Sequence, residues 1–156
     1  MKNALLIILV AAVLFSCKKD KFTTAPQIEF VDISPNFAPK GLTNLQDNLI
    51  PKLIFNIRDA EGDFGTDAAG DSSWIFIKHS LTAELDSVRF PNLQRAPKNN
   101  FDAEVSASLF RFLDCNPAGG GSARVDTIFY QVYVKDAKGN KSNVFTTTKP
   151  VLVECN

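Results

Sequence analysis

A two-residue alternation of apolar and polar side chains, repeated between turns, is the feature that most limits the possible folds of this chain. It is clearest over residues 126–135 and again over residues 51–58. The apolar members are Ile128, Tyr130, Val132 and Val134 in the later segment, and Leu53, Phe55 and Ile57 in the earlier one. Alternation at this period is typical of a β-strand with one buried side. The chain is therefore predicted to be all-β.

Seven segments have strand-like patterns, and no amphipathic helix longer than two turns is apparent. The predicted strands span residues 27–33, 51–58, 73–79, 84–90, 101–114, 126–135 and 141–153. Strands at these short intervals predict an antiparallel, immunoglobulin-like β-sandwich of about seven strands, with a small open barrel as the alternative. Trp74 is expected at the buried tryptophan position of such a sandwich. The apolar pattern of residues 101–114 slips by one position, which predicts a β-bulge.

The N-terminus has the organisation of an export signal. Lys2 precedes an apolar run from Ala4 to Phe15, and Ser16 lies before Cys17. A run of about 12 residues is shorter than the roughly 20 needed to cross a bilayer as a helix. We therefore expect a secretory signal and no permanent transmembrane helix.

The sequence Leu14-Phe15-Ser16-Cys17 resembles a bacterial lipobox. The resemblance implies cleavage before Cys17 and lipidation of that residue; an ordinary signal peptide with an incidental cysteine is the alternative. The expected organisation is a signal peptide (residues 1–16), a lipidated cysteine and tether (17–26), and a β-sandwich domain (27–156). Because Lys18 replaces the Asp associated with inner-membrane retention, we expect a lipid anchor in the outer membrane.

Two cysteines remain after lipidation, Cys115 and Cys155. An even pair in an exported chain predicts a disulfide, with two unrelated buried thiols as the alternative. The bond would close a loop of some 40 residues and stabilise the domain by about 4 kcal/mol on the chain-entropy model.

The charges exclude one class of partner. The chain has 17 basic and 17 acidic residues, and no basic tract rises above this background. A nucleic-acid-binding surface is therefore not expected.

The loop after the second predicted strand is strongly acidic. Between Asp59 and Asp71 it has five carboxylates and no Lys or Arg. Carboxylates so close together repel one another unless a cation or water relieves them, and oxygen ligands with glycines between them suit Ca²⁺. Sandwich topology would bring the 136–140 turn to the same end. Our candidate calcium ligands are Asp59, Glu61, Asp63, Asp67 and Asp136, and a solvated acidic loop is the alternative.

Two stretches resemble uncharacterised lipoproteins of Bacteroidetes-type bacteria. They are Phe55-Asn56-Ile57-Arg58-Asp59-Ala60-Glu61-Gly62-Asp63-Phe64-Gly65 and Val134-Lys135-Asp136-Ala137-Lys138-Gly139-Asn140-Lys141-Ser142-Asn143. The resemblance implies a cell-envelope protein with an immunoglobulin-like fold. It implies no particular activity.

Catalytic patterns are weak. His79 is the single histidine, no Gly-x-Ser-x-Gly elbow occurs, and the His and Cys clusters of zinc sites are missing. We therefore expect a non-catalytic envelope lipoprotein, a binding or scaffolding module with an unknown protein or glycan partner. The alternative is a glycan-binding accessory protein of a nutrient-uptake system. For that role Phe129, Tyr133 and Phe145 are candidate sugar-stacking residues, although they also suit the second face of the sandwich.

Overall fold

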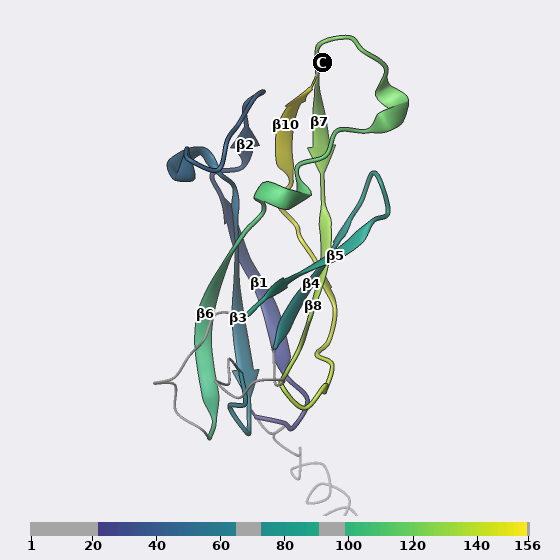
Figure 1. Ribbon diagram of the computed structural model, residues 1–156. Coiled ribbons are helices and arrows are strands. Elements are labelled where there is room, and N and C mark those ends of the chain that lie inside the picture. Colours follow the sequence, from purple (N-terminus) through teal and green to yellow (C-terminus); the bar gives the residue numbers. More distant parts are fainter. Residues whose placement is uncertain (1–21, 65–72, 91–98, 156) are drawn as a thin grey trace, which may run out of the picture.

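The computed structural model describes residues 22–64, 73–90 and 99–155, and its regular structure there consists of strands and single-turn 3₁₀ helices (Figure 1). The strands are β1 (Gln27–Ser34), β2 (Phe37–Ala38), β3 (Lys52–Asp59), β4 (Trp74–His79), β5 (Leu85–Arg89), β6 (Phe101–Ser108), β7 (Arg124–Ile128), β8 (Tyr130–Lys135), β9 (Phe145–Thr146) and β10 (Val151–Cys155). The 3₁₀ helices are η1 (Asp47–Leu49), η2 (Phe110–Phe112) and η3 (Pro117–Gly119). The all-β prediction is confirmed. None of the described residues belongs to a helix long and apolar enough to cross a bilayer.

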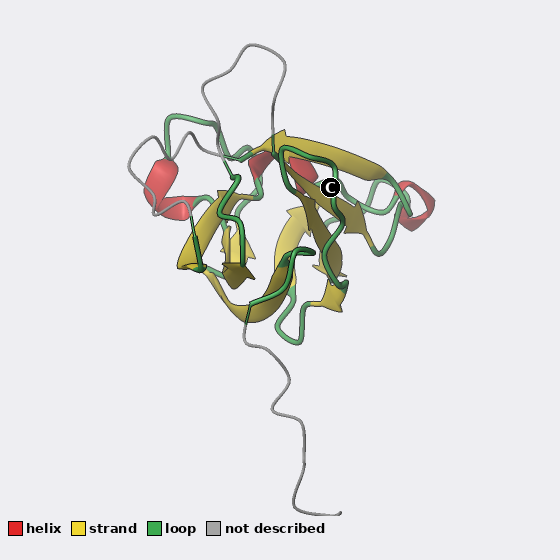
Figure 2. Cartoon of the chain, turned by 90° about the horizontal axis from the view of Figure 1, so that it is seen from below, coloured by secondary structure: helices red, strands yellow, loops and turns green. Residues whose placement is uncertain are grey.

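The strands form three sheets, in the orders β1-β3-β6, β5-β4-β8-β9 and β2-β10-β7. All ladders are antiparallel except that between β2 and β10. Seen from below, the strands surround a common interior (Figure 2). Phe145 on β9 spans that interior, with ring centroids 5.8 Å from Phe30 on β1 and 6.1 Å from Phe55 on β3. This arrangement is consistent with a β-sandwich.

The predicted alternation determines which side chains are buried. Leu53, Phe55 and Ile57 on β3 are 0% exposed, and so are Val132 and Val134 on β8. Each apolar residue removed from water contributes roughly 1.5–3 kcal/mol. The core therefore lies between the β1-β3-β6 sheet and the β5-β4-β8-β9 sheet.

Two predicted strands are each divided between sheets. The 126–135 segment forms β7, which pairs with β10, and β8, which pairs with β4 and β9. Phe129 lies at the break and is 37% exposed. The last predicted strand is divided in the same way, into β9 and β10. Alternation continues through such a break, so it does not reveal where a strand changes partners.

The β-bulge predicted within residues 101–114 is wrong. β6 pairs with β3 without a shift of register, and the chain then enters η2. Leu109 and Phe112 are both buried there, because residues three apart align on one side of a 3₁₀ turn. A bulge occurs instead in β1, between Phe30 and Asp32.

The expected burial of Trp74 is also wrong. Ile75 and Ile77 point into the core, whereas Trp74 is only half-buried, on the outer side of β4. A strand with apolar residues on both sides does not indicate which side faces the core, and the pairing with β8 decides it.

Loops from distant parts of the chain meet at the lower end of the molecule in Figure 1. The main-chain N–H of Ala60 donates to the carbonyl of Thr23 at 3.1 Å, so the first described residues lie beside the loop after β3. The C-terminus lies at the opposite end. The expected signal peptide, the lipidation of Cys17 and the candidate ligand Asp67 lie outside the described residues.

Candidate metal centre

Three carboxylates from two loops meet at the lower end of the sandwich. Asp59 is the last residue of β3, Asp63 lies in the loop that follows, and Asp136 comes directly after β8. One carboxylate oxygen from each residue lies within 4.8 Å of the other two. The predicted approach of the 136–140 turn to the acidic loop is therefore confirmed for Asp136.

Strand alternation explains why two of these carboxylates are buried. Asp59 continues the buried side of β3, one step beyond Ile57, and Asp136 continues that of β8, beyond Val134. Asp59 is 0% exposed and Asp136 is 2% exposed. The alternative of a solvated loop therefore does not apply to these two side chains.

Backbone groups hold the loops in place. Asp59 Oδ2 accepts hydrogen bonds from the N–H groups of Glu61 at 3.2 Å and Gly62 at 2.6 Å. Gly62 has a φ of +61°, a conformation that glycine adopts without a steric cost. The N–H of Ala137 donates to the carbonyl of Asp63 at 3.2 Å, which joins the two loops.

Asp136 is fully hydrogen-bonded by Asn140. Its Oδ1 accepts from the Asn140 main-chain N–H, and its Oδ2 accepts from the Asn140 side-chain amide, each at 2.7 Å. These bonds orient the carboxylate within the 136–140 turn.

The other two carboxylates have unsatisfied oxygens. Asp59 Oδ1 and Asp63 Oδ1 are buried and accept no hydrogen bond, whereas Asp63 Oδ2 forms an ion pair with Lys138 Nζ at 3.3 Å. Burial raises the pKa of Asp59, hydrogen bonds from Gly62 and Glu61 oppose that rise, and the neighbouring Asp63 and Asp136 carboxylates add to it. A buried carboxylate oxygen without a partner is costly, and a bound cation would remove that cost.

Lys138 supplies one positive charge at the edge of the cluster. Its Nζ lies 3.3 Å from Asp63 Oδ2 and also pairs with Glu61. Both carboxylates raise the pKa of Lys138. Glu61 therefore lies against Lys138, and among the predicted ligands that the structure describes, Asp59, Asp63 and Asp136 form the three-carboxylate group.

The spacing of the three oxygens suits calcium. Ca²⁺ accepts about six to eight oxygens at about 2.3–2.6 Å, so two of its ligands are at most about 5 Å apart. The observed spacing of up to 4.8 Å meets that limit. An acidic, oxygen-only donor set is also the chemistry that this cation prefers.

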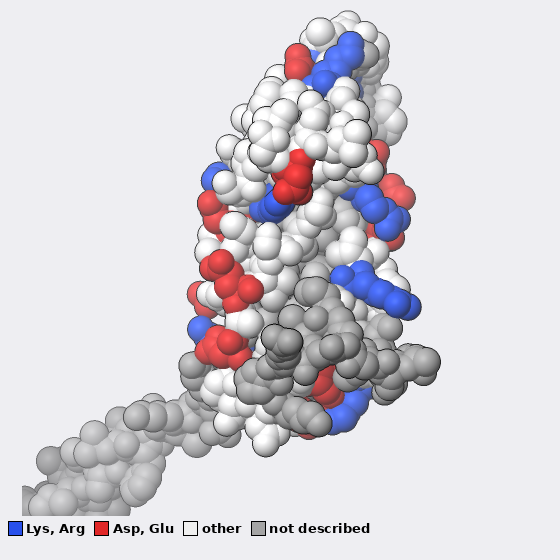
Figure 3. Space-filling model, turned by 60° about the vertical axis from the view of Figure 1, so that its left-hand side comes forward, with Lys and Arg blue, Asp and Glu red and all other residues white. Residues whose placement is uncertain are grey.

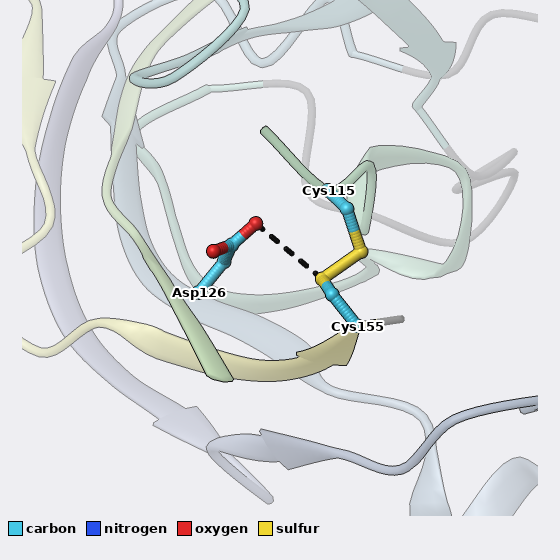
Figure 4. Close-up of side chains that lie close together, drawn as sticks. All are labelled: Cys115, Asp126 and Cys155. Atoms are coloured by element: carbon cyan, nitrogen blue, oxygen red, sulfur yellow. Dashed lines mark hydrogen bonds between the residues drawn. A yellow bond between two sulfur atoms is a disulfide. The ribbon is translucent and has the colours of Figure 1, made fainter. Parts of the chain in front are cut away.

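The predicted disulfide is present at the opposite end (Figure 4). Cys115 and Cys155 are bonded, with their Cα atoms 6.0 Å apart. Asp126 Oδ2 lies 3.4 Å from Cys155 Sγ, but a disulfide sulfur has no proton to donate and is a poor metal ligand. Asp126 instead pairs with Arg124, 2.9 Å from Oδ1, and hydrogen bonds from Arg124 and the Asn116 N–H lower its pKa.

His79 and the candidate sugar-stacking aromatics have different surroundings. The buried His79 uses Nδ1 to accept from the N–H groups of Leu81 and Thr82, at 3.1 and 3.2 Å, which closes the turn after β4. Phe145 packs in the core. Tyr133 lies on the outer side of β8 and stacks on Phe76, with ring centroids 4.6 Å apart.

No family model, curated protein or solved structure matches this chain.

Proposed function

We propose that this protein is a non-catalytic cell-envelope lipoprotein, a binding or scaffolding module anchored in the outer membrane by a lipid on Cys17 and stabilised by calcium. The observation that carries the metal part is the fully buried Asp59, whose Oδ1 has no hydrogen-bond partner beside two further carboxylates. The lipobox-like sequence supports the anchor.

The immunoglobulin-like type of sandwich is part of this proposal. In an immunoglobulin-like sandwich, the first, second and fifth strands lie in one sheet and face the others. Of the seven strands predicted from the sequence, the first, second and fifth correspond to β1, β3 and β6, which form one sheet, and the order of the other main sheet is β5-β4-β8-β9. Tyr130, at the start of β8, donates its hydroxyl to the carbonyl of Phe112 at 2.8 Å. Immunoglobulin-like domains also have a tyrosine near the start of this strand whose hydroxyl bonds to upstream backbone, a few residues away in those domains and 18 residues away here.

The position of the cluster suggests what calcium does. The Thr23–Ala60 hydrogen bond ties the beginning of the domain to the acidic loop, and the proposed lipid precedes Thr23 by only six residues. A cation joining the two loops would stiffen the end of the domain next to the membrane. Affinity in the range of other extracellular modules, about 10⁻⁴ to 10⁻³ M, suits such a structural role.

The non-catalytic part rests on how the potential catalytic groups are used. The Nδ1 of His79 is occupied by two backbone donors, and its Nε2 is buried. The neighbouring Ser80 hydroxyl accepts from the Phe129 N–H at 3.0 Å. Both side chains hold turns in the fold.

Thermal unfolding of the full chain tests the calcium site. With about 2 mM Ca²⁺ and a dissociation constant of about 10⁻⁴ M, binding stabilises the folded state by about 2 kcal/mol, or about 5 °C in Tm relative to chelator. Mg²⁺ at the same concentration should give a smaller shift, since it requires a stricter geometry.

Two variants provide the controls. Asp59→Asn should abolish the calcium shift, whereas Glu29→Gln, which changes an exposed carboxylate of β1, should retain it. No shift in the unmodified protein, or an equal shift in Asp59→Asn, would rule out the proposed site.

A further inference from the structure

The outer side of the β5-β4-β8-β9 sheet has a row of positive charges that runs across the strands. Arg89 on β5 is opposite Trp74 on β4, Trp74 is opposite Lys135 on β8, and Lys135 is opposite Lys141. Directly opposed residues share a face, and neighbouring strands lie about 4.8 Å apart. Three cations and a tryptophan therefore span about 15 Å.

Aromatic rings hold these cations in place. Each of the three has its charged group over a ring: Arg89 over Trp74 at 5.4 Å, Lys135 over Phe76 at 5.5 Å and Lys141 over Tyr133 at 4.0 Å. Cation–π contacts of this kind limit the motion of long side chains. Less conformational entropy then remains to be lost when an anion binds.

The charges of this face are not neutralised by protein carboxylates. Ion pairs involve six of the eleven Lys and Arg in the described segments, namely Lys52, Arg58, Arg111, Arg124, Lys138 and Lys149. The five without an ion pair are Lys40 and four residues of this face, Lys78, Arg89, Lys135 and Lys141. No Asp or Glu occupies the paired outward positions of β4, β5 and β8. By contrast, acidic and basic side chains are interspersed on the side of the molecule in Figure 3.

Neutral groups complete the face. Phe76 and Tyr133 stack with their planes 6° apart, so cations and the partner ring cover their faces. Ser87 lies opposite Phe76 on β5, and Gln131 lies opposite Lys78 on β8. Lys78, Gln131 and Phe129 are among the residues that line a hollow of about 250 Å³.

We propose that this face binds an acidic polysaccharide lying across the strands. The cations suit carboxylate or sulfate groups, Trp74 and the ring edges offer an apolar base for the C–H surfaces of sugar rings, and the polar side chains can bond hydroxyls. Single-stranded nucleic acid fits less well, because base stacking needs open ring faces. An acidic peptide is the competing occupant for a cluster of cations, and binding to polyglutamate distinguishes it from a polysaccharide.

The proposal names a ligand class for the binding module, but it depends on neither the lipid nor the metal. Binding of the full chain in detergent to heparin and to polygalacturonate, with neutral dextran as the reference, tests it. We expect binding to both acidic polymers at about 50 mM NaCl, strong weakening at about 500 mM, and none to dextran. If the protein fails to bind one or both of the acidic polymers, the proposal is overturned. The calcium-dependent shift in Tm and the mass of the lipidated protein are measured separately, so that result would not affect the proposed calcium site or anchor.

Charge reversal locates the site. Lys141→Glu and Arg89→Glu should each weaken heparin binding about fivefold or more, whereas Lys40→Glu, an exposed lysine on another part of the surface, should change it less than about twofold. The Tm of each variant provides a check on folding. An equal loss in Lys40→Glu, or binding to polyglutamate or phosphatidylglycerol vesicles as tight as to heparin, overturns the polysaccharide assignment.

Discussion

Asp59 combines two environments in one carboxylate. Its Oδ2 accepts two backbone hydrogen bonds that shape the turn after β3, while its Oδ1 is buried without a partner. Ionised Asp59 is therefore held where its charge is poorly compensated, and its pKa is raised. A bound divalent cation would compensate the charge of Asp59 and favour its ionised form.

Calcium stabilisation should grow with pH. A carboxyl group with a raised pKa in the folded state contributes stability below its unfolded value of 3.8, and that contribution is lost as the pH rises through the folded pKa. The difference in Tm between calcium and chelator should therefore widen from about pH 4 to 7. In Asp59→Asn the chelated protein should be more stable than the unmodified one by about 1 kcal/mol. A gap independent of pH contradicts this account of Asp59.

The pKa of His79 is shifted in the opposite direction to that of Asp59. Burial lowers its pKa from 6.5, so the associated stability is present above the unfolded value and is lost as the pH falls through the folded pKa. His79→Asn, which retains an acceptor for the two N–H groups, should lose less Tm than the unmodified protein between about pH 7 and 5. Parallel losses in the two proteins would show that other groups control this pH range.

At the level of elements, two bonds fix the η2–η3 region to the strands. The Tyr130 hydroxyl connects η2 to β8, and the Cys115–Cys155 disulfide connects the segment between η2 and η3 to β10. Both partners of the hydroxyl bond are buried. The η2–η3 region is therefore held in place by tertiary contacts.

Removal of the Tyr130 hydroxyl should be costly. In Tyr130→Phe the buried carbonyl of Phe112 loses its donor, so we expect a loss of about 1–2 kcal/mol in the free energy of unfolding. Urea denaturation measures it. Tyr133→Phe is the matched control, since Tyr133 lies on the outer face, and it should change stability by less than about 0.5 kcal/mol. Equal losses in the two variants would contradict the role of the Tyr130 bond.

The disulfide should contribute more to the free energy of unfolding than the Tyr130 hydroxyl does. Its cysteines are separated by 40 residues, which corresponds to about 4 kcal/mol on the chain-entropy model. The double variant Cys115→Ser/Cys155→Ser should lose that stability in urea denaturation and become insensitive to reductant. If reductant shifts the variant as much as the unmodified protein, the bond is not the source of the effect.

At the scale of the whole molecule, the disulfide and the acidic cluster lie at opposite ends of the sandwich (Figure 1). The acidic end is next to Thr23 and so to the proposed anchor. The face with Arg89, Lys135 and Lys141 is the outer side of the β5-β4-β8-β9 sheet. The proposed anchor and the proposed calcium site therefore share one end of the molecule, and the proposed ligand-binding face lies along its side.

The anchor predicts both a mass and a location. Protein from membranes of the expressing bacterium should begin at an acylated Cys17, and Cys17→Ala should move it to the soluble fraction, because two or more acyl chains bind a bilayer far more strongly than an unmodified chain. Mass spectrometry and fractionation measure this. An unmodified Cys17 in the mature protein would exclude the anchor.

Sequence alone determined the all-β class, the buried sides of β3 and β8 and the cysteine pair, because alternation and cysteine number are local or compositional properties. It also identified Asp59, Asp63 and Asp136 as candidate ligands. The burial of Asp59 and Asp136 is foreseeable too, since these two residues continue the alternation of their strands.

Tertiary structure decided what depends on pairing between distant segments. The outward position of Trp74, the division of residues 126–135 between two sheets and the alignment of Arg89 with Lys135 and Lys141 all follow from strand register. A shift of one residue would turn each of these side chains to the opposite face. These features depend on which distant segments pair with each other, and the alternation within one segment does not specify its partners.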